Sequence, residues 1–113
     1  MAVDPERVRA LALALQDASE APHMHRVAFR TPRKIFLTLG EATRDAVLLF
    51  DPDLRDFYCE QAPEAFRPVH GGWGRMGMTA CDLDAVDEAT FRSALLAAFA
   101  LAQPKAKSKR APK

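Results

Sequence analysis

Three apolar segments of strand length follow one another in the first half of the chain and constrain its fold more than any other feature. In "HRVAFR", residues 25–30, and "KIFLTLG", residues 34–40, aliphatic or aromatic side chains alternate with other types, the period of a strand. "DAVLLF", residues 45–50, is continuously apolar, as in a central strand that is buried on both faces. The turn-like linker "GEATRD" between the last two predicts an antiparallel hairpin.

Helical patterns surround these strands. A first helix is expected from Asp4, its N-cap, with apolar side chains at helical spacing as far as Ala18. A second is expected from the N-cap Asp51 to about Gln61, and the last begins near Asp87 and ends before Pro104. The second helix is expected to bury Leu54, Phe57 and Tyr58. The last is expected to bury Phe91, Leu95, Ala98, Phe99 and Ala102.

The region between the last two helices contains a loop and one more strand. Residues 62–72, "APEAFRPVHGG", are rich in proline and glycine and are expected to form a loop. In "GRMGMTACDL", residues 74–83, Met76 and Met78 alternate with other side chains, which predicts a strand. The order helix, three strands, helix, strand, helix predicts an α+β fold: an antiparallel sheet of about four to five strands with helices packed on one face.

Within that region, "GWGRMG", residues 72–77, has the spacing of a glycine-rich loop that binds dinucleotides. Such a loop joins a strand to a helix in a βαβ unit, whereas here the residues that follow alternate like a strand and no GK[ST] ending is present. We therefore expect no dinucleotide and no other cofactor. The glycines are interpreted as permitting a turn into the strand, with Trp73 as its structural anchor and Met76 in the core.

Composition excludes several classes of protein. The chain has 113 residues, of which 49% are hydrophobic and 27% charged, as is typical of one globular domain. Its apolar stretches are too short to span a membrane, and "MAVDPERVRA" at the N-terminus lacks an apolar signal region. Two cysteines fit a reduced cytoplasm, where we expect the protein. We assign residues 1–104 to a single domain and residues 105–113 to a disordered basic tail.

The net charge of +1 hides an asymmetry between the domain and the tail. Five of the 16 basic residues lie in the tail, which leaves 11 basic against 15 acidic side chains, a net charge of −4, in the rest of the chain. A negatively charged domain does not attract nucleic acid through its overall charge. Nucleic-acid binding therefore has to depend on a local basic patch, on the tail, or on both. The basic residues of the tail are Lys105, Lys107, Lys109, Arg110 and Lys113.

Two long segments resemble the MmcQ/YjbR family of small bacterial proteins. Residues 19–39, "SEAPHMHRVAFRTPRKIFLTL", contain a Pro-His pair, a strand that ends in F-R and one that begins with K-I-F. Residues 63–105 contain "WGRMGMT" and "LDAVDE" ahead of the terminal helix. The resemblance implies a compact α+β fold, likened to frataxin and to the double-wing DNA-binding fold of a phage transcription factor, and implies DNA binding by analogy of fold. Arg33 departs from the family, in which glycine is usual at this position.

Basic side chains at the turn-rich edges of the expected sheet indicate nucleic-acid binding. Every charged side chain between residues 23 and 40, and between residues 65 and 80, is basic. We predict sequence-tolerant phosphate contacts to DNA or RNA, because no helix presents a row of base-reading side chains. Trp73 and Phe36 would add stacking if they are exposed. The predicted contacts are Arg26, Arg30, Arg33, Lys34, Arg67 and Arg75.

Other functions have weaker support. His23 and His25 are spaced H-x-H, but no C-x-x-C or H-x-x-x-H spacing supports a metal site. Motifs for a catalytic nucleophile and H-E-x-x-H are missing from the sequence, so we expect no enzyme. The alternative to nucleic-acid binding is a non-catalytic interaction or regulatory module. An open sheet edge would then pair with another protein or with a second copy of the chain, and the arginines would form a solvated rim.

Overall fold

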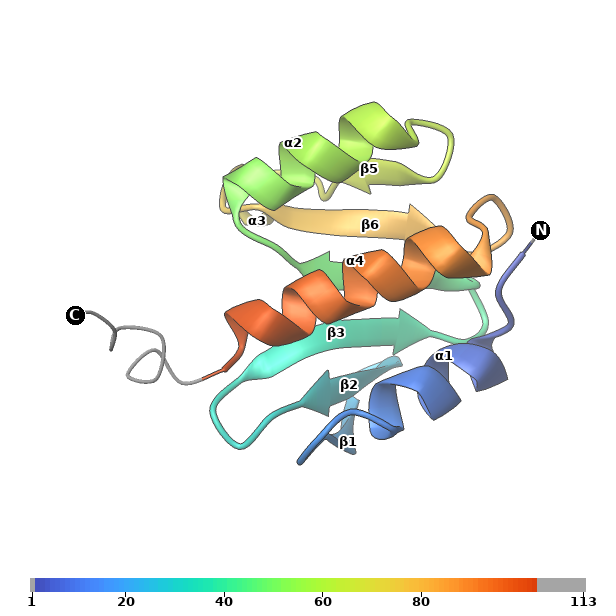
Figure 1. Ribbon diagram of the computed structural model, residues 1–113, viewed down its shortest axis with the longest axis vertical. Helices are drawn as coiled ribbons and strands as arrows, with labels where there is room; N and C mark the ends of the chain where they lie inside the picture. The colour runs from blue at the N-terminus through green and yellow to red at the C-terminus, as the bar shows by residue number, and fades with distance from the viewer. Residues whose placement is uncertain (1, 104–113) are drawn as a thin grey trace.

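The computed structural model describes residues 2–103, which form an antiparallel sheet covered by helices (Figure 1). The predicted element order is confirmed, with two additional strands and one additional short helix. The predicted tail, residues 105–113, lies outside the described residues. In chain order the elements are α1 (Pro5–Leu13), β1 (Ser19–His23), β2 (Arg26–Arg30), β3 (Ile35–Gly40), β4 (Asp45–Leu49), α2 (Pro52–Gln61), β5 (Phe66–Pro68), α3 (Gly72–Arg75), β6 (Met78–Asp82) and α4 (Glu88–Leu101).

The sheet has six strands in the order β1-β2-β3-β4-β6-β5, and every neighbouring pair is antiparallel. The α+β class is confirmed, but the expected count of four to five strands was too low, because both edge strands were missed. All of β1 is exposed and has no alternation, and its Pro22 is tolerated because one side of an edge strand is unpaired. β5 has only three residues and ends at Pro68, within the segment that was expected to be a loop.

The three predicted consecutive strands are β2, β3 and β4, which pair as expected. β4 is central, but only one of its faces is buried. Ala46 and Leu48 are buried, whereas Val47 and Leu49 on the opposite face are only half-buried. The prediction that both faces are buried was therefore wrong, because the helices pack on the face that carries Ala46 and Leu48 (Figure 1).

The core lies between this face and the helices. α4 crosses β3 and β4 (Figure 1), and its predicted apolar stripe faces the sheet. Phe99 is half-buried and packs edge-on against the fully buried Phe36, with 5.5 Å between the ring centroids. The largest fully buried side chains include Phe29, Phe36, Phe66, Phe91, Leu37, Leu39 and Leu48.

The predicted N-caps of the two longer helices are confirmed. The Asp51 carboxylate accepts a hydrogen bond from the Leu54 amide at 2.9 Å, and the Asp87 carboxylate accepts one from the Thr90 amide at 2.7 Å. These bonds satisfy amide groups that have no partner within the helix. The first helix begins after Asp4, as expected, but ends at Leu13 and is shorter than predicted.

The glycine-rich segment forms the four-residue helix α3, and β6 begins only at Met78. Two of its glycines are required by close backbone approach. A β-carbon at Gly74 would overlap the carbonyl oxygen of Val69. One at Gly77, where φ is 118°, would overlap the backbone at Phe50 and Asp51. The glycine spacing that resembles a dinucleotide-binding motif is therefore explained by close packing of the backbone at Gly74 and Gly77.

Met76 and Phe57, which were expected to be buried, are exposed, and so is Trp73, which was expected to anchor a turn. Trp73 and Met76 are 60% and 62% exposed, because α3 replaces the strand whose alternation would have buried the methionine. Phe57 of α2 is 53% exposed, although Tyr58 beside it is buried as predicted and Leu54 is half-buried. None of the helices between residues 2 and 103 has the length and apolar character of a membrane span.

Candidate nucleic-acid interface

One end of the sheet gathers several turns and helix ends. Arg30 pairs with Ile35, so the β2–β3 turn lies at the end where Leu49 of β4 pairs with Met78, the first residue of β6. α3 directly precedes Met78, and α4 finishes at the same end (Figure 1). We call this region the basic end. It is defined by the side chains of Arg30, Arg33, Lys34, Arg55 and Arg75.

Most of the predicted phosphate contacts have no acidic partner. In the described part of the chain no ion pair involves Arg30, Arg33, Lys34, Arg67 or Arg75. Arg26 differs, because its guanidinium pairs with Asp45 at 3.0 Å and also donates to the Thr38 hydroxyl at 3.0 Å. Its charge is therefore already balanced within the sheet.

The β2–β3 turn is bound to the last turn of α4. The Thr31 hydroxyl donates to the Ala102 carbonyl at 3.1 Å, and the Arg33 Nε donates to the Gln103 carbonyl at 3.1 Å. The last carbonyls of a helix have no intrahelical partners and carry partial negative charge, so cations are favourable there. Arg33 thus has a structural role that the sequence did not predict, while its side chain remains exposed.

α3 is held against α2 by Arg55, a residue that the sequence analysis did not single out. Its Nη1 donates to the Gly74 carbonyl at 2.8 Å, and its guanidinium pairs with Asp56 at 2.9 Å. The sequence shows Arg55 only as a polar position of an amphipathic helix and contains no signal for the contact with α3. Arg75 and Trp73 are both exposed on α3, two residues apart in the sequence.

Several acidic side chains lie near the basic end, and some of them have partners. Glu20 of β1, opposite Phe29 and next to Arg30 in the sheet, pairs with Arg9, and the exposed Asp17 precedes the same strand. Asp51 caps α2, and Asp56 pairs with Arg55. Asp53 is exposed in the first turn of α2. Among the cations of the basic end, Arg30, Arg33, Lys34 and Arg75 form no ion pair with these acids within residues 2–103.

Most of the remaining ion pairs lie toward the opposite end of the sheet, where β3 ends and β4 begins. Arg9 pairs with Glu20 and Glu41, and Arg44 pairs with Asp84 and Asp4. The N-terminal end of α4 is linked to α1 by an ion pair between Arg7 and Glu88, whose hydrogen bond lowers the pKa of Glu88. Seven of the 15 acids take part in ion pairs of the described structure, and one of these, Asp56, lies at the basic end.

The structure places Arg67, like Arg26, away from the basic end, since both arginines lie near Asp45. Arg67 lies on edge strand β5, opposite Ala80 of the neighbouring strand β6. There it lines a shallow hollow together with the acids Asp45, Asp82 and Asp84. Phe36 is fully buried, so of the two aromatics proposed for stacking only Trp73 is accessible.

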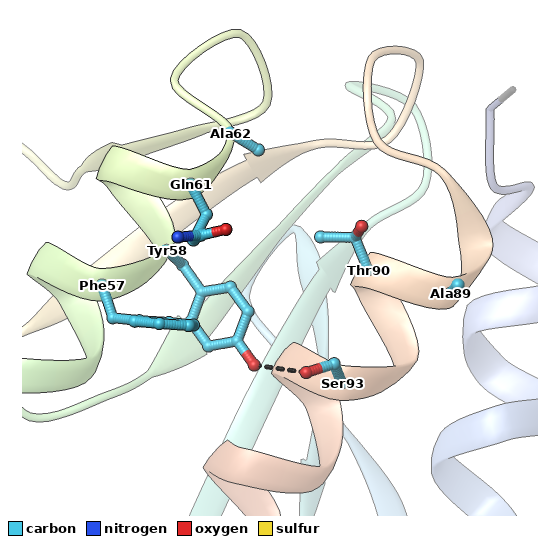
Figure 2. Close-up of a pocket in the computed structure, with 7 residues that line it drawn as sticks. All are labelled: Phe57, Tyr58, Gln61, Ala62, Ala89, Thr90 and Ser93. Carbon is cyan, nitrogen blue, oxygen red and sulfur yellow. Dashed lines mark hydrogen bonds between the residues drawn. The ribbon is translucent and has the colours of Figure 1, made fainter.

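A second surface feature is a neutral groove of about 330 Å³ between α2 and α4. Figure 2 shows Tyr58 and Ser93 pointing toward each other across it, and their hydroxyl groups are hydrogen-bonded at 2.5 Å. The exposed ring of Phe57 and the side chains of Gln61 and Thr90 also line the groove (Figure 2). No charged side chain lines it, so it does not suit a phosphate.

The cysteines and histidines do not assemble into a reactive site. Cys81 is buried, and burial raises the pKa of its thiol to about 12, so it stays protonated at neutral pH. His23 and His25 lie at the β1–β2 turn and are exposed. Between residues 2 and 103, no three histidine, cysteine or acidic side chains are grouped in a way that could hold a metal ion.

Comparison with known proteins gives a family and a fold. A family model described as YjbR matches residues 13–101. The structure is similar to the crystal structure of Deinococcus radiodurans protein DR2400, which has a DUF419 domain, with a TM-score of 0.74 and 15% sequence identity. The match covers 98% of this chain and 83% of that one. No curated protein matches this sequence.

Proposed function

This chain belongs to the YjbR family, and we propose that it binds nucleic acid through the basic end, by phosphate contacts that tolerate different sequences. The observation that carries the proposal is the gathering of Arg30, Lys34 and Arg75, none of which has a carboxylate partner within residues 2–103, at one end of the sheet. Lys34 and Arg75 are exposed and Arg30 is half-buried. Accessible cations supply the sequence-independent part of nucleic-acid affinity.

The position of the basic tail in the sequence supports the proposal that nucleic acid binds at the basic end. The described structure ends at Gln103, whose carbonyl accepts a hydrogen bond from Arg33 of the basic end. The sequence continues with five basic residues within the next ten. We propose that these cations strengthen binding, which removal of residues 105–113 tests.

A negative domain can still bind a polyanion at one end. Charges separated by more than about 8–10 Å are largely screened at physiological ionic strength. The ion-paired acids toward the opposite end, such as Glu41 and Asp84, therefore oppose binding only weakly. Long-range attraction would be small, so binding is expected to be weak above moderate salt and to depend on close contact.

The surface favours backbone contacts over the reading of bases. Among the described residues, the basic end consists of turns, the first turns of α2 and the four-residue α3. Reading a duplex sequence usually requires a helix or a strand pair with polar side chains that fits the major groove. We propose a non-catalytic role for the protein in the cytoplasm.

The proposal is tested by titrating fluorescently labelled DNA of about 20 nucleotides, single-stranded and duplex, with the protein at several salt concentrations. Four phosphate contacts would make log K fall with log salt with a slope of about −3, and the tail would steepen it. A chain that ends at residue 104 is expected to bind about tenfold more weakly but to keep a slope near −3. Absence of salt-dependent binding by this shortened chain at low ionic strength would show that the basic end is not a phosphate site.

A protein-interaction module is the second candidate, favoured by the neutral groove between α2 and α4. Phe57 and Leu96 are 53% and 51% exposed on these two helices, and exposed apolar side chains often mark protein contacts. The partner in this case is another protein or a second copy of the chain. Sedimentation of the purified protein, and its Phe57→Ser and Leu96→Ser variants, would reveal self-association that depends on this surface.

A further inference from the structure

The most exposed aromatic ring of the described structure stands at the basic end. Trp73 is 60% exposed, while the buried aromatic rings Phe29, Phe36 and Phe91 fill the core. Tryptophan is large and apolar, and most tryptophans are substantially buried in folded proteins. A tryptophan exposed to this extent leaves a large flat surface in water, where it can stack against another ring.

The backbone that carries Trp73 is fixed. Gly74 packs so closely on Val69 that no β-carbon fits, and Gly77 packs in the same way on Phe50. From the side of α2, Arg55 donates to the Gly74 carbonyl at 2.8 Å. A ring on a fixed backbone loses less conformational entropy when it binds than a ring on a mobile loop.

The neighbours of the ring combine charge with apolar surface. Arg75, two residues along, is exposed and has no carboxylate partner among residues 2–103. Met76 is 62% exposed and extends the apolar surface beside the ring. A cation that contacts a phosphate next to a ring that stacks on a base is the combination by which proteins bind single strands.

The β2–β3 turn offers further cations within reach of the same strand. Leu37 of β3 and Thr79 of β6 are each paired with Leu48 of β4, so they are two strand spacings apart, about 10 Å. The turn that carries Lys34 and the helix that carries Trp73 continue from these strands at the same end of the sheet. A few nucleotides are enough to span both.

We propose that the ligand of the basic end is single-stranded nucleic acid, with an unpaired base stacked on Trp73 and flanking phosphates bound by Arg75 and Lys34. This proposal depends on the proposed function. It adds a preference, because the bases of a duplex are already paired and stacked and leave no free face for the ring. Stacking on an aromatic ring tolerates any base, in agreement with a surface that does not read sequence.

Trp73 is the only tryptophan of the chain, so its fluorescence reports on this contact alone. The full chain is titrated with a mixed-sequence single strand of about 12 nucleotides and with a hairpin duplex of similar length, and binding of labelled copies is followed in parallel by anisotropy. We expect the single strand to bind about tenfold more tightly and to quench tryptophan emission, and the duplex to leave the emission nearly unchanged.

Substitutions at two positions distinguish an effect on base stacking from an effect on folding. Trp73→Leu is expected to weaken single-strand binding about tenfold and duplex binding little, whereas Trp73→Phe keeps part of the preference. Phe57→Leu, which alters an exposed ring in the α2–α4 groove, should change neither affinity. Equal binding of both DNAs without quenching, or equal weakening of both by Trp73→Leu, would overturn the single-strand preference and leave phosphate binding intact. If neither DNA binds at low salt, the proposed function itself fails and the preference with it.

Discussion

Replacing Lys34 and Arg75 together by glutamate is expected to weaken binding of a single strand of about 20 nucleotides by about 100-fold at low salt. Both side chains are exposed at the basic end and neither pairs with a carboxylate within residues 2–103. Each substitution removes one attractive contact with phosphate and adds a repulsive one, which together cost about 1.4 kcal/mol per substitution in a solvated site. Anisotropy titration measures the loss, and the slope of log K against log salt should become shallower by about 1 to 2.

The matched control reverses the same amount of charge elsewhere. Arg67 on β5 and Arg92 on α4 are also exposed and make no ion pair in the described structure. Converting both to glutamate changes the net charge by the same four units, so it reproduces the effect of overall charge. We expect this variant to bind within about threefold of the wild type. A loss as large as that of the Lys34 and Arg75 variant would mean that net charge, and not the basic end, determines affinity.

Replacing Phe36 by alanine is expected to lower the free energy of unfolding by about 3–5 kcal/mol. Phe36 is fully buried between β3 and α4 and packs edge-on against Phe99. Removing the ring loses the free energy gained by burying its apolar surface and leaves a cavity that the surrounding sheet cannot close. Since domains of this kind are stable by only about 5–15 kcal/mol, the urea midpoint should fall sharply.

Phe57→Ala provides the comparison for that measurement, because it removes the same ring from a position that is 53% exposed on α2. We expect it to destabilise the fold by less than about 1.5 kcal/mol, mainly through loss of the edge-on contact with Tyr58, whose ring centroid lies 5.0 Å away. If Phe36→Ala is no more destabilising than Phe57→Ala, the assignment of Phe36 to the core is wrong.

The parts of the fold that the sequence predicts are those encoded by neighbouring residues. Alternation in the sequences of β2 and β3 and the capping carboxylates of Asp51 and Asp87 are local signals. The structure confirms the two strands and the two caps, although burial along the strands does not alternate. The edge strands carry no such signal. β1 is exposed along its whole length and β5 has three residues, so each exists through its pairing with a longer neighbour, β2 or β6. A strand that forms through pairing with a distant segment leaves no periodic pattern in its own sequence, so the sequence does not predict it.

The candidate site shows the same division. The sequence names six cations as phosphate contacts, and among them Arg26 has a carboxylate partner within residues 2–103. Its partner, Asp45, is brought to it by the register of β2, β3 and β4, which spacing alone does not reveal. Trp73 was expected to anchor a turn, yet its ring is 60% exposed, while Gly74 and Gly77, which follow it, pack closely on Val69 and Phe50.

The most direct test of the account is to map the binding surface by NMR, following the backbone amide signals of the full chain as an unlabelled single strand of about 12 nucleotides is added. The account predicts that the largest shifts occur in the β2–β3 turn, residues 31–34, and around α3, residues 72–77, together with the indole N–H of Trp73. Signals from residues lining the α2–α4 groove and from β5 should change little. Shifts concentrated in that groove or along β5, with residues 31–34 and 72–77 unaffected, would contradict it.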